Sequence, residues 1–202
     1  HIDPYRALDT YYSLTQHFPM TVNTFFSELF KDYSKGKGSY KSLILGQYSA
    51  QLNLGSAYLR DIPFSDLKAF ETIFSNLPER LHLQLANSST VRYAQLFDMP
   101  QHAEVYCNRG TSGIDGSTAT AVGAAMINPN PSLLVTGDLS FFYDINGLWN
   151  DYIPSNFRIV LINNHGGGIF RILPGAKDRP IYDTYFETIH NHQNQHYLFD
   201  FH

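Results

Sequence analysis

Two short apolar runs, each followed by small polar residues, constrain the fold of this chain more than any other feature. The first, Leu133–Thr136, precedes Gly137-Asp138, and the second, Phe157–Ile162, precedes Asn163-Asn164. Each run has the length of a buried strand, and the 26 positions from Asp138 to Asn164 match one strand–helix–strand crossover. Because parallel strands joined in this way end at the same edge of a sheet, we expect Asp138 and Asn164 to lie side by side.

The alternation of strands and helices extends over the region from residue 62 to residue 162. A helix is expected from Pro63 to about Leu77, with Ser65 as its N-cap. Four strands are expected at Leu81–Ala86, Glu104–Asn108, Leu133–Thr136 and Phe157–Ile162, with helical segments near Val91–Phe97, Gly116–Ile127 and Tyr143–Tyr152. This order predicts an α/β fold with a central, mostly parallel sheet flanked by helices. Such sheets bind ligands outside the carboxyl ends of their strands, where this chain places small or polar residues.

The first sixty residues have a weaker pattern. Apolar residues recur at three- and four-residue intervals over residues 5–35, and Pro19 interrupts them, which predicts two helices. Leu43–Leu45 is compatible with a short strand, and residues 46–61 show no clear period. We expect residues 1–60 to form a helical connector and residues 61–202 to form the ligand-binding domain, truncated at its C-terminal end. Since no initiator Met is present, the chain is expected to be a piece of a longer protein.

Composition excludes several classes of protein. A hydrophobic content of 43%, of which much is aromatic, is typical of a folded domain. The net charge of −4 gives no basis for binding nucleic acid or an anionic membrane, and no apolar run is long enough to span a bilayer. The single cysteine, Cys107, excludes an internal disulfide and favours a cytoplasmic location. We expect Cys107 to be a small buried residue and not a nucleophile.

Asp138 and Asn164 have the chemistry of a hard-cation site. A carboxylate, an amide oxygen and a backbone carbonyl suit Mg2+, which also takes phosphate oxygens. The glycines of Gly166–Gly168 allow the backbone to approach a ligand closely and free a carbonyl for the ion. The helix that follows would direct its amino end at a diphosphate. The alternative is that Gly-Asp and Asn-Asn only cap helices and turns.

The tail from Pro174 is rich in Tyr, His, Asn and Gln and has little periodicity, which predicts a loop and then an irregular or partly ordered end. Zinc binding by its histidines would require a nearby Cys or carboxylates, so we expect a solvated His-rich segment instead. These histidines are His190, His192, His196 and His202.

Gly137-Asp138-Leu139, followed by Asn163-Asn164, resembles the Gly-Asp…Asn-Asn signature of thiamine-diphosphate enzymes. Three longer runs narrow the resemblance to the MenD family, the 2-succinyl-5-enolpyruvyl-6-hydroxy-3-cyclohexene-1-carboxylate synthases of menaquinone biosynthesis. These runs are Asn108–Gly116, Gly137–Ser140 and Asn163–Phe170. The resemblance is densest over residues 81–174. It implies the three-layer thiamine-diphosphate-binding fold and identifies the chain as the C-terminal part of such an enzyme.

The resemblance implies roles for residues on the cofactor side of the site. Asp138, Asn164 and the carbonyl of Gly166 would bind Mg2+, for which Mn2+ could substitute. Ile114 would be the apolar wedge under the thiazolium ring that keeps thiamine diphosphate bent, although from the residues alone it could equally be core. The residues implied in cofactor binding are Ile114, Gly137, Asp138, Leu139, Ser140, Asn164, Gly166 and Gly167.

On the substrate side, the family acts on 2-oxoglutarate and isochorismate. Arg92 and Arg109 would bind their carboxylates, because guanidinium groups match carboxylates with two hydrogen bonds. Ser88, Phe170 and Leu173 would line the same pocket, with core packing as the alternative for the last two. Arg171 is expected to face solvent, and a side-chain role for His165 is not expected.

The resemblance also implies what this chain lacks. In the family, an activating Glu belongs to an N-terminal domain, and nothing here resembles that domain, so no catalytic residue is expected in this chain. The family's active site forms between subunits, which implies a homo-oligomer, a dimer or a tetramer. Thiamine would serve as electron sink while a succinyl carbanion, formed from 2-oxoglutarate by loss of CO2, adds to isochorismate. We expect the chain by itself to be inactive.

Two other hypotheses fit the same residues. An acetolactate-synthase-like thiamine enzyme would share Asp138 and Asn164 without needing Arg92 and Arg109. A non-catalytic α/β interaction module with a degenerate site would need none of them.

Overall fold

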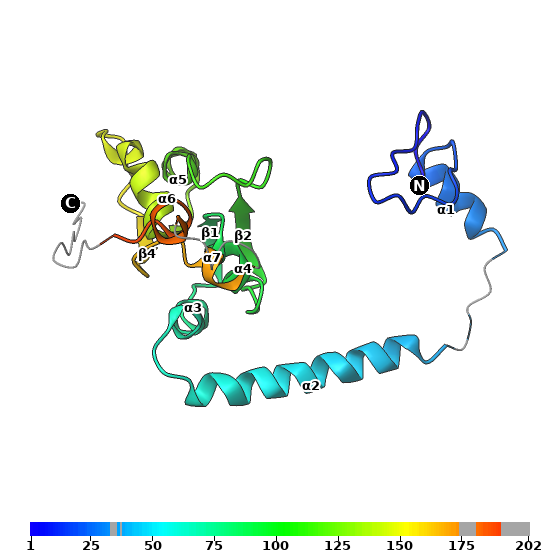
Figure 1. Ribbon diagram of the computed structural model, residues 1–202, viewed down its shortest axis with the longest axis horizontal. Coiled ribbons are helices and arrows are strands. Elements are labelled where there is room, and N and C mark those ends of the chain that lie inside the picture. The colour runs from blue at the N-terminus through cyan, green and yellow to red at the C-terminus, as the bar shows by residue number, and fades with distance from the viewer. Residues whose placement is uncertain (33–35, 37, 174–180, 191–202) are drawn as a thin grey trace. The chain divides into compact units, whose positions relative to one another are not determined.

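The computed structural model describes residues 1–32, 36, 38–173 and 181–190 of the chain (Figure 1). The chain divides into two compact units, His1–Gly55 and Ser56–His202. The long helix α2 (Tyr40–Asp61) spans this division. None of the described helices is both long enough and apolar enough to cross a membrane.

In the first unit, the helix α1 (Val22–Leu29) begins at Thr21, whose Oγ1 accepts a hydrogen bond from the Thr24 amide at 3.2 Å. The helix predicted before Pro19 is wrong, because that segment forms turns. Two aspartates cap these turns: Asp3 accepts from the amides of Tyr5 and Arg6, and Asp9 from those of Ser13 and Leu14. Such local bonds compete with helix formation. The amides of Arg6 and Tyr5 also lower the pKa of the Asp3 carboxyl. The part of the helix prediction on residues 33–35 lies outside the described residues.

The strand predicted at Leu43–Leu45 is also wrong, because these residues lie in α2. The amide of Leu43 donates to the carbonyl of Ser39 at 2.9 Å, which is a helical hydrogen bond. A three-residue apolar run has too little length for its period to distinguish a strand from a helix. All residues of α1 and α2 are described, and none of them is buried.

The second unit contains a four-stranded parallel sheet of order β2-β1-β3-β4. The strands are β1 (Arg80–Leu85), β2 (His102–Cys107), β3 (Ser132–Gly137) and β4 (Phe157–Ile162). All four predicted strands are present, and the prediction of an α/β fold is confirmed. In this order β1 and β3 are the central strands, and β3 lies directly beside β4.

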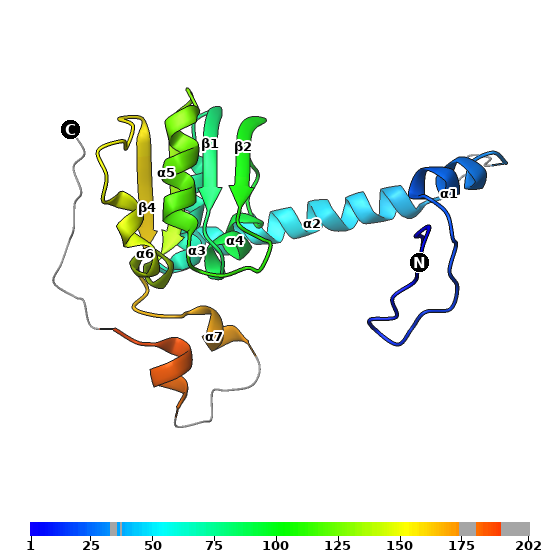
Figure 2. The same cartoon turned by 90° about the horizontal axis from the view of Figure 1, so that it is seen from above.

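Helices cover both faces of this sheet, as predicted. On one face lie α3 (Asp66–Ser75) and α4 (Ser89–Ala94), and on the other lies α5 (Ser117–Ile127), as Figures 1 and 2 show. Because successive strand residues point to opposite faces, Val135 packs in a core cluster with Phe70 of α3, whereas Leu134 packs in a second cluster with Ala121 of α5. The predicted N-cap is confirmed: Ser65 Oγ accepts from the Lys68 amide at 3.4 Å.

The helix predicted over Tyr143–Tyr152 is wrong. The helix after β3 is instead α6 (Asp138–Tyr143), and a short 3-10 turn, η1 (Ile145–Leu148), follows it. The reason is tertiary. The buried carboxylate of Asp144 accepts from the Ala119 amide at 2.7 Å, and Gly147 lies so close to Ala119 that an added Cβ would be 2.9 Å from its backbone. The chain is therefore bent against the start of α5, which stops the helix.

Among the described residues, two short helical segments follow β4, namely α7 (Ile169–Ile172) and η3 (Tyr182–Glu187), a π-helical turn. The second agrees with the prediction that the end of the tail is partly ordered. The predictions for residues 174–180 and 191–202 lie outside the described residues.

We predict that Leu83→Ala, in the middle of β1, destabilises this unit by about 3 kcal/mol, because Leu83 has 0% exposure and its loss leaves a cavity. Urea denaturation followed by circular dichroism measures the change. Ile127→Ala is the matched control: Ile127 is 86% exposed, so its replacement should change the free energy of unfolding by less than about 0.5 kcal/mol. Equal effects of the two substitutions would contradict the assigned core.

Candidate functional site

A cavity of about 460 Å3 lies at the carboxyl edge of the sheet. The segments that follow all four strands reach it, with Ser88 after β1, Arg109 after β2, Asp138 after β3 and Asn164 after β4. Every site residue predicted from the sequence lines this cavity. They are Ser88, Arg92, Arg109, Ile114, Gly137, Asp138, Leu139, Ser140, Asn164, Gly166, Gly167, Phe170 and Leu173. The structure thus brings them together, while what each of them binds stays a prediction.

The cavity also has lining residues that sequence reasoning did not select. The most informative of them are Asp66, at the start of α3, and Asn87, at the end of β1. The sequence places Asp66 only within the helix expected from Pro63, and Asn87 only directly after the strand expected at Leu81–Ala86. Their partners are distant in sequence, so no local pattern could have found them.

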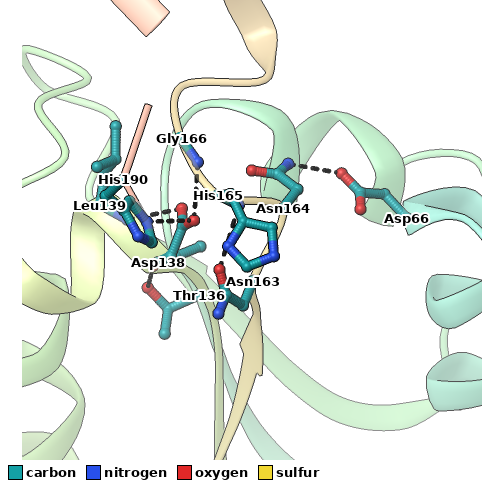
Figure 3. A network of polar contacts seen from close by, with 10 residues as sticks. Asp66, Thr136, Asp138, Leu139, Asn163, Asn164, His165, Gly166 and His190 are labelled. Carbon is teal, nitrogen blue, oxygen red and sulfur yellow. Dashed lines mark hydrogen bonds and ion pairs between the residues drawn. The ribbon is translucent and has the colours of Figure 1, made fainter. Parts of the chain in front are cut away.

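Asp138 lines the cavity, and its buried side chain belongs to a residue with only 2% exposure. The register of β3 against β4 pairs Gly137 with Ile162, so Asp138 and the segment after β4 leave the sheet together. Asp138 Oδ1 accepts from the Leu139 amide at 2.8 Å, and Oδ2 accepts from the Gly166 amide at 2.9 Å (Figure 3). These bonds offset the cost of burying the charge. The segments after β3 and β4 therefore come together as expected: Asp138 is bonded to Gly166, and Asp138 and Asn164 line the same cavity.

Among the described residues, only the Nδ2 end of the Asn164 side-chain amide has a hydrogen-bond partner. Its Nδ2 donates to Asp66 Oδ2 at 2.8 Å. Its Oδ1 is buried and has no hydrogen-bond partner among the described residues. In Figure 3 this oxygen lies on the side of Gly166 and Asp138, away from Asp66. A buried acceptor without a donor is costly in a folded protein, and a bound cation would remove that cost.

The absence of side chains at Gly166 and Gly167 allows the backbone around Glu187 to pack closely against this loop. Gly166 has φ +154°, and an added Cβ there would lie 2.6 Å from the Glu187 carbonyl oxygen. The Gly167 amide donates to that same oxygen at 2.6 Å. The segment after η3 therefore packs directly against this loop, and a side chain at Gly166 would displace it.

His190 takes part in the site, which corrects the prediction of a solvated His-rich tail. It is the one histidine of that tail within the described residues, and its side chain is 13% exposed. Its Nε2 lies 2.9 Å from Asp138 Oδ2, and its amide donates to the His165 carbonyl at 3.2 Å. The other three, His192, His196 and His202, lie outside the described residues.

Asn87 organises the loop that follows β2. The side chain is 1% exposed, and its Nδ2 donates to the carbonyls of Asn108 at 2.7 Å and Gly113 at 2.6 Å. Its Oδ1 accepts from Arg109 Nη1 at 2.8 Å. Asn87 thereby holds the loop at its first residue, Asn108, and again at Gly113, and it binds the Arg109 side chain. The loop is tied to α6 as well, because Ser140 Oγ donates to the Ile114 carbonyl at 2.6 Å.

Cys107 is half-buried at the end of β2, and its Sγ lies 3.4 Å from Asn87 Oδ1. Burial raises the pKa of the Cys107 thiol, and the Arg109 guanidinium opposes this in part. A raised thiol pKa disfavours the thiolate, which agrees with the expectation that Cys107 is not a nucleophile.

The three arginines near the cavity have different partners. Arg92 Nη1 donates to the Ser88 carbonyl at 2.8 Å, and neither Arg92 nor Arg109 forms an ion pair within the described residues. Arg171 does not line the cavity; its half-exposed side chain pairs with Glu187. The expectation that Arg171 faces solvent is thus only partly correct.

A cation at this site would depend on mixed oxygen ligands. Among the described residues, no group of three or more His, Cys, Asp or Glu side chains could hold a metal ion. The oxygens that could contribute are the Asp138 carboxylate, Asn164 Oδ1, which has no partner in the described part of the chain, and the Gly166 carbonyl, which also accepts from the Gly168 amide at 2.9 Å. This all-oxygen set fits Mg2+ or Mn2+ and does not fit zinc.

The fold and the cavity define a class of protein: a parallel α/β domain with a ligand-sized cavity at the carboxyl ends of its strands. No family model matches the chain. Curated proteins do match. The chain is 52% identical over 190 residues to the 2-succinyl-5-enolpyruvyl-6-hydroxy-3-cyclohexene-1-carboxylate synthase of Flavobacterium psychrophilum, which covers 94% of this chain and 34% of that protein.

Synthases of the same name from two other organisms are also similar to this chain. Identity is 51% over 196 residues with that of Flavobacterium johnsoniae, covering 97% of this chain and 35% of the relative. The identity with the synthase of Christiangramia forsetii is 59% over 134 residues, which cover 66% of this chain and 23% of that relative. The chain belongs to this family of synthases and spans about a third of the length of the first two relatives.

We predict that Asn87→Ala lowers the free energy of unfolding by about 2–3 kcal/mol, because it removes the donor to two part-buried carbonyls, those of Asn108 and Gly113, and the acceptor for Arg109. Urea denaturation tests this. Asn76→Ala is the control, since Asn76 is exposed and makes a single side-chain bond, to the Thr72 carbonyl. A loss for Asn87→Ala no larger than the control's would show that Asn87 does not hold the loop.

Proposed function

We propose that this chain is the diphosphate- and Mg2+-binding part of a thiamine-diphosphate enzyme of menaquinone biosynthesis. The enzyme would decarboxylate 2-oxoglutarate and transfer the succinyl unit to isochorismate. One observation carries the proposal: Asp138 and Asn164 line the same cavity of about 460 Å3, and Asn164 Oδ1 has no hydrogen-bond partner among the described residues. The identity to synthases named for that product supports it.

The cation would be held by Asp138, by Oδ1 of Asn164 and by the carbonyl of Gly166. All three residues line the cavity, and hard cations of this size prefer such oxygens. Gly137, Leu139, Ser140 and Gly167 line the same wall and would contact the diphosphate or the rings. Thiamine diphosphate supplies the electron sink for decarboxylation when it is bound.

Ile114 would support the bent cofactor. Its backbone carbonyl is bonded to Ser140 of α6, which fixes the residue relative to the Asp138 end of the cavity. An apolar, β-branched side chain fixed in this way is suited to act as a rigid wedge. In this role Ile114 would supply orientation, which is the protein's contribution to the chemistry of a bound cofactor.

The substrate carboxylates would be bound by Arg92 and Arg109. Both guanidinium groups line the cavity and lack a carboxylate partner among the described residues. The two substrates together carry several carboxylates, which such groups bind with two hydrogen bonds each. Ser88, Phe170 and Leu173 complete this part of the lining. An acetolactate-synthase-like enzyme would have no need of this arginine pair, and substrate profiling separates the two activities.

In this proposal, residues 1–60 are the connector from a preceding domain, and residues 61–202 are the diphosphate-binding domain. The active enzyme would be a cytoplasmic homodimer or homotetramer whose site includes a second chain. These assignments follow from the family and from the relatives' greater length.

We predict that the chain binds thiamine diphosphate with Mg2+ weakly, and that Asp138→Ala lowers the affinity by at least about tenfold, because it removes the charged ligand. Isothermal titration calorimetry measures both, first on the chain alone and then with the N-terminal part of the Flavobacterium johnsoniae relative added. Asp151→Ala, which changes an exposed carboxylate outside the cavity lining, should leave the affinity unchanged. If no binding occurs in either setting, the chain is a non-catalytic module.

We also predict that the purified 202-residue chain alone forms no succinyl-transfer product from 2-oxoglutarate and isochorismate, because the family's activating Glu belongs to a domain not recognisable here. Chromatographic product analysis over several hours tests this. Product above the level seen with Asp138→Ala would contradict it.

A further inference from the structure

Asp66 and Asn164 are joined across 98 positions of sequence. Asp66 is the first residue of α3, Asn164 follows β4, and both line the cavity. The Nδ2 of Asn164 donates to Oδ2 of Asp66 at 2.8 Å, as Figure 3 shows. This bond ties the start of the second unit's first full helix to the end of its last strand.

The bond determines which way the Asn164 amide faces. A side-chain amide has a donor end and an acceptor end of nearly the same size, and a carboxylate can only accept. The end that faces Asp66 must therefore be Nδ2, and Oδ1 must face the opposite way. That oxygen is buried, has no partner among the described residues and lies on the side of Asp138 and Gly166 (Figure 3).

Gly168 restrains the same amide from another side. A Cβ added at Gly168 would lie 2.7 Å from Asn164 Nδ2 and 3.4 Å from its Cγ. The amide therefore occupies the space in which any other residue would place its side chain. Asn164 is held between a carboxylate and a glycine backbone.

We propose that Asp66 is a positioning residue that orients Oδ1 of Asn164 toward a cation bound at Asp138; this rests on the proposed function. Asp66 does so by accepting from Nδ2, without itself contacting the ion. When this acceptor is lost, the amide is free to rotate and present Nδ2, a donor, to the cation. Outer partners of metal ligands typically change metal affinity by about 10–100-fold.

A merely structural role for Asp66 is distinguishable. An acidic residue in the first turn also stabilises a helix through its dipole. Ser65→Ala is the matched control, because it removes the N-cap of α3, and so weakens the same helix end by about 1 kcal/mol, while leaving the Asp66–Asn164 bond in place.

The experiment compares the full chain with Asp66→Ala and Ser65→Ala in two measurements. The first, without any cation, is the side-chain NH2 signal of Asn164 in a 15N-labelled sample, assigned by its loss in Asn164→Asp. We expect Asp66→Ala to move this signal to the position of a solvent-exposed Asn, and Ser65→Ala to leave it unchanged. The second is Mn2+ affinity in the presence of thiamine diphosphate, measured by electron paramagnetic resonance of the free ion. Asp66→Ala should weaken it about 10–100-fold.

The outcomes separate the two claims. An Asn164 signal that does not respond to Asp66→Ala overturns the inference, and so does a Mn2+ affinity that Asp66→Ala and Ser65→Ala weaken equally. If the wild-type chain binds no Mn2+ while the Asn164 signal still depends on Asp66, the proposed function fails, and the orientation of the amide by Asp66 is supported.

Discussion

The parallel pairing of β3 with β4 is the constraint on which the candidate site depends. Gly137 lies opposite Ile162, so the two strands end together and the residues after them leave the sheet at one edge. Asp138 can be buried there because the amides of Leu139 and Gly166 donate to its two oxygens. A cavity bordered by the ends of all four strands then forms around the buried Asp138 carboxylate.

Long-range polar contacts, more than apolar packing, set the geometry of the loops around that charge. Asn87 holds the loop after β2, Asp66 holds Asn164, and Asp144 holds the start of α5. Each is a short side chain whose hydrogen bonds reach across the fold. Away from water, losing one partner of such a contact is costly, because the other partner is left as a polar group without a hydrogen bond. The apolar clusters on the two faces of the sheet stabilise the fold, and these polar contacts determine where the loops around the cavity lie.

Sequence reasoning succeeded where the signal was local. The strand Phe157–Ile162 is predicted with the bounds it has in the structure, and Ser65 is the predicted N-cap, because short buried strands and capped helix starts have few alternatives. It failed where tertiary contacts decide: Leu43–Leu45 is helical, and the helix after β3 begins at Asp138. The gathering of the site residues was predictable from the rule that parallel strands end at one edge and from the family resemblance. The partners of Asn164 and Asp138, namely Asp66 and His190, were not, since 98 and 52 positions separate each pair.

The central claim is that Asp138 and Asn164 share a cation that binds a diphosphate. The most direct test is a crystal structure of the chain grown with thiamine diphosphate and Mn2+, in which anomalous scattering locates the ion. We predict an anomalous peak about 2.0–2.6 Å from an Asp138 carboxylate oxygen and from Asn164 Oδ1, the range of bonds between hard cations and oxygen. A diphosphate bound in the cavity with the Mn2+ peak away from these two residues would contradict it.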